Sequence, residues 1–198
     1  MFLISRITFC AAALSAFAFT AQAEDWVLDG GASSLAFGSI KKDSVGETHR
    51  FGSLSGQVGA DGNATLEIDL SSIETNIDIR NERMIEHVFK NVPTATVTAE
   101  IDMSEFNETA VGESVTTFID GTLNFLGAEV PFDVDVYMMR LTEDKVMVAT
   151  DGMFFVAAED AGINPGIDKL MELAELPSIT RASPVTFRLM FDAKDIES

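Results

Sequence analysis

Residues 132–138 read Phe-Asp-Val-Asp-Val-Tyr-Met, in which apolar side chains alternate with polar or amphipathic ones. A period of two places one set of side chains on each face of an extended strand. The same alternation recurs in residues 65–70, 96–103 and 185–192. Each segment therefore predicts a β-strand with one face in the protein interior and the other in water.

Five further segments indicate strands with a less regular alternation. They are Trp26–Asp29, Ser34–Ile40, Phe51–Val58, Thr116–Leu126 and Lys145–Ala157. The dipeptide Asp61-Gly62 is typical of a tight turn between two strands. About eight antiparallel strands with a continuous apolar face close either as a sandwich or as a barrel, and composition does not decide between them.

Two segments break the alternation and predict short helices within this all-β chain. Asn81 is suited to cap a helix whose apolar face carries Met84 and Phe89. Asn164-Pro165 suits the start of a second helix, which Pro177 would end.

The first 23 residues have the features of a secretory signal peptide. Arg6 precedes a short apolar run, and Ala21-Gln22-Ala23 is a small-x-small cleavage pattern. We expect cleavage before Glu24, a single domain over residues 24–198, and a location in the periplasm or outside the cell.

Charge and cysteine content exclude several classes of partner and site. The chain has 13 Lys and Arg against 32 Asp and Glu, which gives a formal net charge of −19. Such a surface repels nucleic acid and disfavours standing attachment to anionic membranes. The single cysteine, Cys10, would leave with the signal peptide, so we expect no disulfide and no cysteine-based metal site.

The sequence contains little that indicates catalysis, and we predict no catalytic or metal-binding residue. Residues 52–56 read Gly-Ser-Leu-Ser-Gly, which places leucine where a nucleophile elbow needs its nucleophile. His49, in Glu47-Thr48-His49-Arg50-Phe51, would act as a general base, hydrogen-bond a ligand head group, or lie at the surface at a strand end. His87 is better read as an exposed helical side chain.

The aromatic residues of the strands provide the more informative signal. Phe125, Phe132 and Phe187 fall on the inner faces of separate predicted strands, and Met138 lies beside them. Such residues form either a plain core or the wall of a pocket. A lumen with almost no inward polar groups suits a long hydrocarbon chain.

Four stretches follow one another in a distinctive order. They are Trp26–Asp29 with Ser33–Phe37, Ser72–Asn76 running into Arg80–Met84, Pro93–Val97, and Gly121–Gly127 before Val130-Pro131. Together they resemble the motifs of the YceI family of exported bacterial lipid-binding proteins. Ala32 stands where many members have histidine. Residues 161–166 and the helix after them resemble a branch sometimes attached to membrane b-type cytochromes.

The resemblance implies an extended, lipocalin-like antiparallel barrel of about eight strands whose lumen holds a polyisoprenoid chain, such as a quinone tail. The lumen candidates are Leu35, Phe37, Ile68, Val97, Ile101, Leu123, Phe125, Phe132, Val134, Val136, Phe187 and Leu189. The candidates for the cap or entrance are His49, Arg80, Met84 and Phe89. We also expect Arg80 or Arg83 to pair with a nearby acid. Beyond this lipid, no cofactor is implied.

Three functional hypotheses remain at this point. The first is a non-enzymatic periplasmic carrier of an isoprenoid or quinone-like lipid, with transient docking to a membrane or membrane cytochrome. The second is an accessory subunit that docks on a membrane b-type cytochrome and holds no ligand, which a filled lumen would favour. The third is a hydrolase that uses His49, which a water-filled mouth reached by His49 and Glu47 would favour. Whether the protein forms a homodimer is left open.

Overall fold

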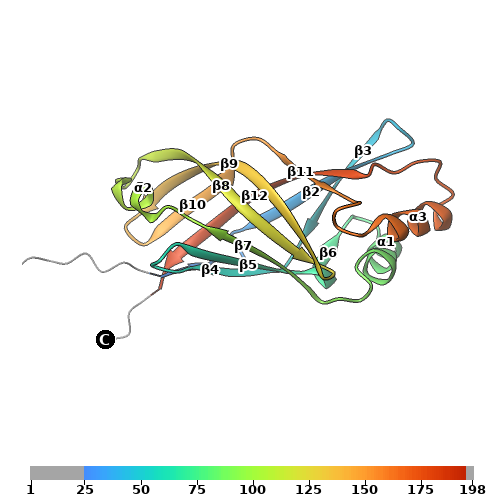
Figure 1. Ribbon diagram of the computed structural model, residues 1–198, viewed down its shortest axis with the longest axis horizontal. Helices are drawn as coiled ribbons and strands as arrows, with labels where there is room; N and C mark the ends of the chain where they lie inside the picture. The colour runs from blue at the N-terminus through green and yellow to red at the C-terminus, as the bar shows by residue number, and fades with distance from the viewer. Residues whose placement is uncertain (1–24, 195–198) are drawn as a thin grey trace, which may run out of the picture.

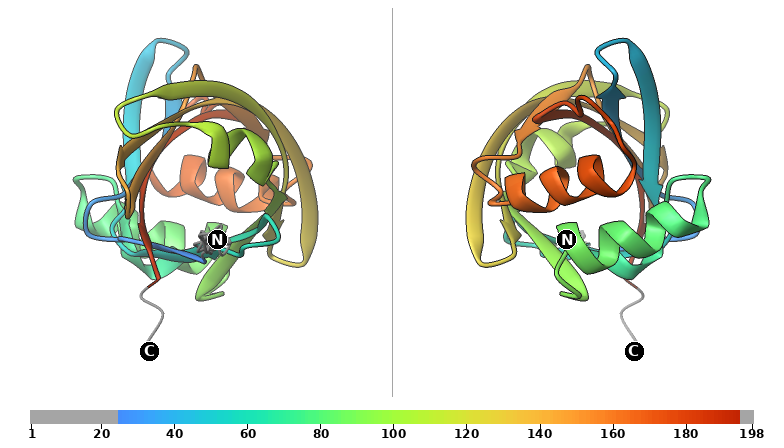
Figure 2. Two further views of the ribbon diagram at one scale, coloured as in Figure 1. Left: turned by 90° about the vertical axis from the view of Figure 1, so that its left-hand side faces the viewer. Right: turned by 90° about the vertical axis from the view of Figure 1, so that its right-hand side faces the viewer.

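The computed structural model describes residues 25–194, so the predicted signal peptide lies outside the described residues. One antiparallel sheet of twelve strands curls until it closes on itself, because β1 pairs with β4 on one side and with β12 on the other. Around the closed ring the strands are β1 (Trp26–Leu28), β4 (Leu54–Val58), β5 (Asn63–Asp69), β7 (Thr94–Glu100), β8 (Ser114–Phe125), β9 (Ala128–Thr142), β10 (Lys145–Thr150) and β12 (Ala182–Ala193). Figure 1 shows this barrel from the side and Figure 2 from its two ends. The fold is the barrel that the family resemblance implied.

Four more strands lengthen the barrel beyond the ring. They are β2 (Ser34–Lys41), β3 (Val45–Phe51), β6 (Ile73–Glu74) and β11 (Phe154–Ala157). The second half of β12 belongs to the ring, whereas its first half pairs with β2 and β11. The sheet then continues from β2 through β3 to β6. This extension builds the wall at one end of the lumen.

The side chains of β9 face inward and outward as the alternation in the sequence predicted. Val134 and Val136 point inward and are only 6% and 1% exposed, whereas Asp133 and Asp135 are exposed. Each inward valine contributes roughly 1.5–3 kcal/mol through burial of apolar surface. The inner face of the sheet is therefore the core, and the lumen lies inside it.

A short helix, α2 (Met103–Glu108), covers the end of the barrel where β1 lies. Its Phe106 ring meets the Trp26 ring edge-on with 5.0 Å between centroids. The Arg140 guanidinium lies 5.6 Å from the Phe106 ring and 6.0 Å from the Trp26 ring. We call this group of three side chains the aromatic plug. It closes the barrel at this end.

Helical segments cover the opposite end, as the right view of Figure 2 shows. After the 3-10 turn η1 (Leu70–Ser72), the chain forms α1 (Asp78–Arg83), continues as the π-helical η2 (Met84–Val88), and later returns as α3 (Asn164–Leu173). Gly166 of α3 packs directly on η2, where an added Cβ would lie 2.5 Å from the His87 carbonyl oxygen. Only glycine allows this approach. No helix within residues 25–194 is long and apolar enough to cross a bilayer.

Two strand predictions were wrong because each predicted segment spans the break between two separate strands. The segment 51–58 is not one strand, because β3 ends at Phe51 and β4 begins at Leu54. The Ser72 hydroxyl accepts hydrogen bonds from the Gly52 and Ser53 amides and holds the chain in that corner. The segment 145–157 likewise divides into β10 and β11. Gly152 lies between them with a φ of 126°, which an L-residue rarely adopts.

Two helix-related predictions also need correction. The predicted strand 96–103 ends at Glu100, and Met103 begins α2, because the Asp102 carboxylate caps the helix by accepting from the Ser104 amide. Asn81 is not an N-cap, since α1 already begins at Asp78. Its side-chain carbonyl instead accepts hydrogen bonds from the Thr75 amide and hydroxyl.

Candidate functional site

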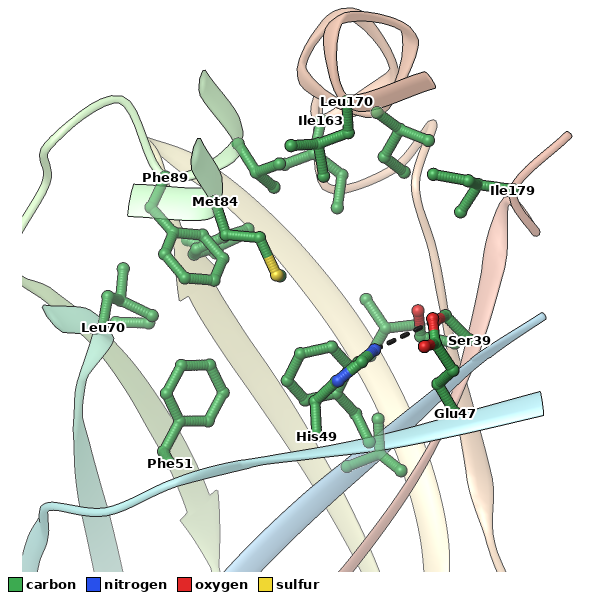
Figure 3. A pocket seen from close by; sticks show the side chains of 18 of the residues that line it. Ser39, Glu47, His49, Phe51, Leu70, Met84, Phe89, Ile163, Leu170 and Ile179 are labelled. Atoms are coloured by element: carbon green, nitrogen blue, oxygen red, sulfur yellow. Dashed lines mark hydrogen bonds between the residues drawn. The ribbon is translucent and has the colours of Figure 1, made fainter. Parts of the chain in front are cut away.

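A cavity of about 440 Å³ lies between the barrel wall and the helical segments. Its wall is mostly aliphatic and aromatic. The helices contribute Met84 and Leu170 to it, and Phe89 follows directly after η2 (Figure 3). Ile77 and Ile79 also line it, although they are 44% and 51% exposed. The cavity therefore opens to solvent beside α1. We call it the outer compartment and its opening the mouth.

A second cavity of about 130 Å³, the inner compartment, lies toward the aromatic plug. Trp26, Phe106 and Val134 are among its lining residues. Both compartments share four wall residues, which are Leu66, Val97, Phe132 and Phe187. The lumen is thus one apolar channel. The four shared side chains form a constriction that divides it in two.

Every residue predicted for the lumen or entrance lines one of these compartments. The outer compartment alone has Leu35, Phe37, Ile68, Leu123, Phe125, His49, Arg80, Met84 and Phe89. The inner compartment alone has Ile101, Val134, Val136 and Leu189. Val97, Phe132 and Phe187 contribute to both. The fold therefore brings the candidates together, and their role toward a ligand remains a prediction.

Paired strands β2 and β3 build a polarity gradient into the wall of the outer compartment. Toward the mouth, the lining residues of β2 are Leu35, Phe37, Ser39 and Lys41, and those of β3 are Phe51, His49 and Glu47. Because alternate residues share a face, the pairing sets Phe37 beside His49 and Ser39 beside Glu47. Along both strands the lining side chains are first apolar, then neutral polar and finally charged. Polar groups therefore line the lumen only near its mouth.

The charged group at the mouth is Glu47 with two cations. The Arg80 guanidinium and the Lys41 ammonium each donate to a different Glu47 carboxylate oxygen at 2.7 Å. Burial alone would raise the pKa of Glu47, but the hydrogen bonds from Arg80 and Lys41 lower it below its ordinary value. Glu47 is therefore the acid that we expected beside Arg80, and its charge is already neutralised.

His49 is the most buried polar residue of the cavity wall and is only 4% exposed. A hydrogen bond of 3.0 Å joins its Nε2 to the Ser39 hydroxyl (Figure 3). Its Nδ1 is buried without a partner among residues 25–194. Burial and the nearby Arg80 charge lower the pKa of His49 to about 4, so the ring is neutral near pH 7. A neutral imidazole with one free nitrogen can bind a single polar group.

Part of this mouth was not predicted from the sequence. Ser39 and Lys41 were not among the candidates, and Glu47 was considered only beside a hydrolytic His49. The signal that would have found them is the period of two in both strands, which puts Ser39 and Lys41 on one face of β2 and Glu47 and His49 on one face of β3. In α3, Ile167 and Leu170 also line the outer compartment.

A hydrogen-bonded turn fixes Arg80 at the mouth. The Arg80 guanidinium donates to the Thr75 carbonyl oxygen, and the buried Thr75 hydroxyl donates to Asn81 on the same helix. These residues belong to one of the stretches that carried the family resemblance. That stretch therefore has a structural task, which is to hold the helix and its cation against the barrel wall.

Comparison with known proteins identifies the family. A model of the YceI-like domain matches residues 26–191. The chain belongs to the YceI-like family. A solved YceI-like neighbour is a polyisoprenoid binding domain from Saccharophagus degradans implicated in plant cell wall breakdown. It is 37% identical, with a TM-score of 0.82 over 85% of this chain and 98% of that one.

A second neighbour shows how far the YceI-like fold extends at low identity. Burkholderia cenocepacia BcnA is 17% identical, with a TM-score of 0.63 over 82% of this chain and 98% of its own. At this identity the likeness concerns the fold alone. A search of curated proteins finds no match.

Proposed function

We propose that this protein is a non-enzymatic carrier that holds a polyisoprenoid or quinone-like lipid in its lumen. The observation that carries the proposal is the outer compartment, an apolar cavity of about 440 Å³ that opens to solvent. A closely packed core has few voids larger than a water molecule, so a cavity of this size is a built feature. The polyisoprenoid-binding neighbour from Saccharophagus degradans supports the same class of ligand.

His49 gives the proposed ligand an orientation. Its free Nδ1 and the Arg80 Nε are buried polar atoms without partners in the described chain. Leaving such atoms unpaired costs roughly 1–3 kcal/mol each, which a ligand carbonyl or hydroxyl would recover. We therefore place the polar head of the lipid beside His49 and its tail against the apolar wall.

The same geometry argues against hydrolysis. A serine–histidine pair needs a basic imidazole that a third group orients through its other nitrogen. Here the pKa of His49 is lowered to about 4, and the nearest candidate carboxylate, Glu47, is bound to Lys41 and Arg80. The Ser39–His49 hydrogen bond therefore serves to fix the ring. The open cavity also favours the carrier over a docking subunit with a filled lumen.

Exchange of lipid requires the mouth to reach a bilayer. Ile40, Ile77 and Ile79 are between 44% and 51% exposed, and Ile77 and Ile79 border the cavity opening. Arg83 also lines it, and the charges of Lys41 and Arg80 together exceed the single charge of Glu47, so this end suits lipid phosphates. We propose that this end docks transiently on a membrane surface while the acidic barrel stays in water. The location outside the cytoplasm rests on residues 1–23.

The test is organic extraction of the purified protein, followed by mass spectrometry. We expect an isoprenoid lipid in the wild type and a lower yield of head-bearing lipid in His49→Leu. In direct binding, His49→Leu should lose about tenfold in affinity for a quinone but little for the tail hydrocarbon. His87→Leu, which changes the other histidine, is the matched control. A wild type with no extractable lipid and no affinity for added isoprenoids would contradict the carrier proposal.

A further inference from the structure

The constriction between the two compartments is a specific packing arrangement. The Phe132 ring stacks on the Phe154 ring with centroids 4.7 Å apart, and Phe154 meets Phe187 at 6.4 Å. Val97 and Phe187 lie on β7 and β12, which are four strands apart in the ring of eight and so face each other across the lumen. Apolar side chains thus approach from opposite walls.

A glycine in the neighbouring strand determines where the Phe132 ring lies. Gly121 of β8 is the cross-strand partner of Phe132 and takes an inward position in the alternation. A Cβ at Gly121 would overlap this ring, with the Phe132 Cε1 atom at 2.7 Å. The missing side chain therefore makes the space that the Phe132 ring occupies. The ring is held by Gly121 on one side and by Phe154 on the other.

We propose that Phe132 sets the length of isoprenoid tail that the protein accepts, by closing the inner compartment to the ligand. This inference rests on the carrier function proposed above. In the wild type the tail fills the outer compartment and stops at the constriction. Carbons beyond that length stay near the mouth in water and add little affinity. The inner compartment is a latent second tail site that a smaller residue at position 132 would open.

The experiment compares farnesol with the longer geranylgeraniol by displacement of an apolar fluorescent dye. The measured quantity is the ratio of the two affinities, so that differences in dye binding cancel. We expect a ratio near one in the wild type. Phe132→Leu and Phe132→Met should each raise the preference for geranylgeraniol by about tenfold, because burying even two more methylene groups has that effect.

Two controls assign the effect to the inner compartment. Val134→Phe refills that compartment alone, so adding it to Phe132→Leu should return the ratio to the wild-type value. Phe118→Leu makes the same truncation on the outside of β8, where Phe118 is 56% exposed, and should change nothing. Near-ultraviolet circular dichroism checks that each variant is folded.

The outcomes separate this inference from the carrier proposal. A wild type that binds both alcohols, with Phe132 variants that keep its ratio, would overturn the length limit and leave the carrier function standing. A wild type that already favours geranylgeraniol, and loses this preference in Val134→Phe, would show that the tail passes Phe132. That result would also overturn the inference. Failure of the wild type to bind either alcohol would overturn both proposals.

Discussion

The two ends of the barrel are closed in different ways. At the α2 end, Trp26, Phe106 and Arg140 form a plug of mutually packed side chains. At the mouth, helices span the opening but leave a cavity of about 440 Å³ beneath them. Close packing stabilises a fold, whereas an unfilled apolar space loses the dispersion contacts that its lining would make. The plug end is therefore the more closely packed one, and the larger cavity lies at the mouth.

The largest expected effect tests the plug. Trp26→Ala should lower the free energy of unfolding by about 4 kcal/mol, because it removes a ring that is 3% exposed and both of its plug contacts. Urea unfolding of the ligand-free protein measures this, with the exposed residue Phe118→Ala as the control. A loss under about 1 kcal/mol would contradict the close packing of the plug.

The matching truncation at the mouth should cost less. Phe89 is 4% exposed, and its ring lies 5.9 Å from Phe125 and 6.0 Å from Phe51. Phe89→Ala should lower the free energy of unfolding by about 3 kcal/mol, since it removes a smaller ring than Trp26→Ala and the new space joins the larger of the two cavities. The same urea titration gives the comparison. If Phe89→Ala proves more damaging than Trp26→Ala, the two ends have been assigned the wrong roles.

The mouth should also make stability depend on pH. An ordinary histidine has a pKa near 6.5, and burial lowers that of His49 to about 4. Between these values the unfolded chain takes up a proton that the folded protein does not. The free energy of unfolding should therefore fall by about 1–3 kcal/mol as the pH decreases from about 6.5 to about 4.

The His49→Leu variant isolates this contribution from the carboxylates that also titrate at low pH. Its pH profile should be flatter than that of the wild type by the same amount. Plug residues have no part in this effect, so Phe106→Leu should keep the wild-type slope. Parallel profiles for the wild type and His49→Leu would show that the histidine is not desolvated.

The smallest effect on stability should come from the exposed rim of the mouth. Ile79 is 51% exposed, so Ile79→Ser should change the free energy of unfolding by less than about 0.5 kcal/mol. Its binding to phospholipid vesicles should nevertheless fall roughly fivefold, which corresponds to about 1 kcal/mol of apolar contact. Phe118→Ser on the outer barrel wall should bind vesicles normally. Equal losses in both variants would argue against docking through the mouth.

The fold could be predicted where its determinants are local. The alternation in residues 132–138 gave the correct strand and faces because burial follows directly from a period of two. The corner after Phe51 could not be read in this way. Its amides are held by Ser72, about twenty residues later. Glycine and serine by themselves do not distinguish a corner from an extended strand. The start of α2 did carry a local signal, the Asp102–Ser104 cap, which the regular alternation before it concealed.

The candidate site likewise has a part that could be predicted from local pattern and a part that could not. Its apolar wall was predictable, since inward strand residues line whatever the barrel encloses. The ion-pair group was not, because Arg80 meets Glu47 from thirty-three positions away through a helix whose placement depends on tertiary packing. The division of the lumen was equally hidden. It depends on the position of the Phe132 ring over Gly121. That position is set by the side-chain rotamer and cannot be read from the alternation of residues.

The ring is completed by a pairing between the two extremes of the described chain, Trp26 with Ala193. Contacts between residues so far apart in sequence close the largest loops, and folding that depends on them is slow. We therefore expect the barrel to finish folding only after nearly the whole chain is available, since β12 also provides the partners of β2, β10 and β11. In the export that we propose from residues 1–23, this order of events would keep a completed barrel from forming before the chain has crossed the membrane.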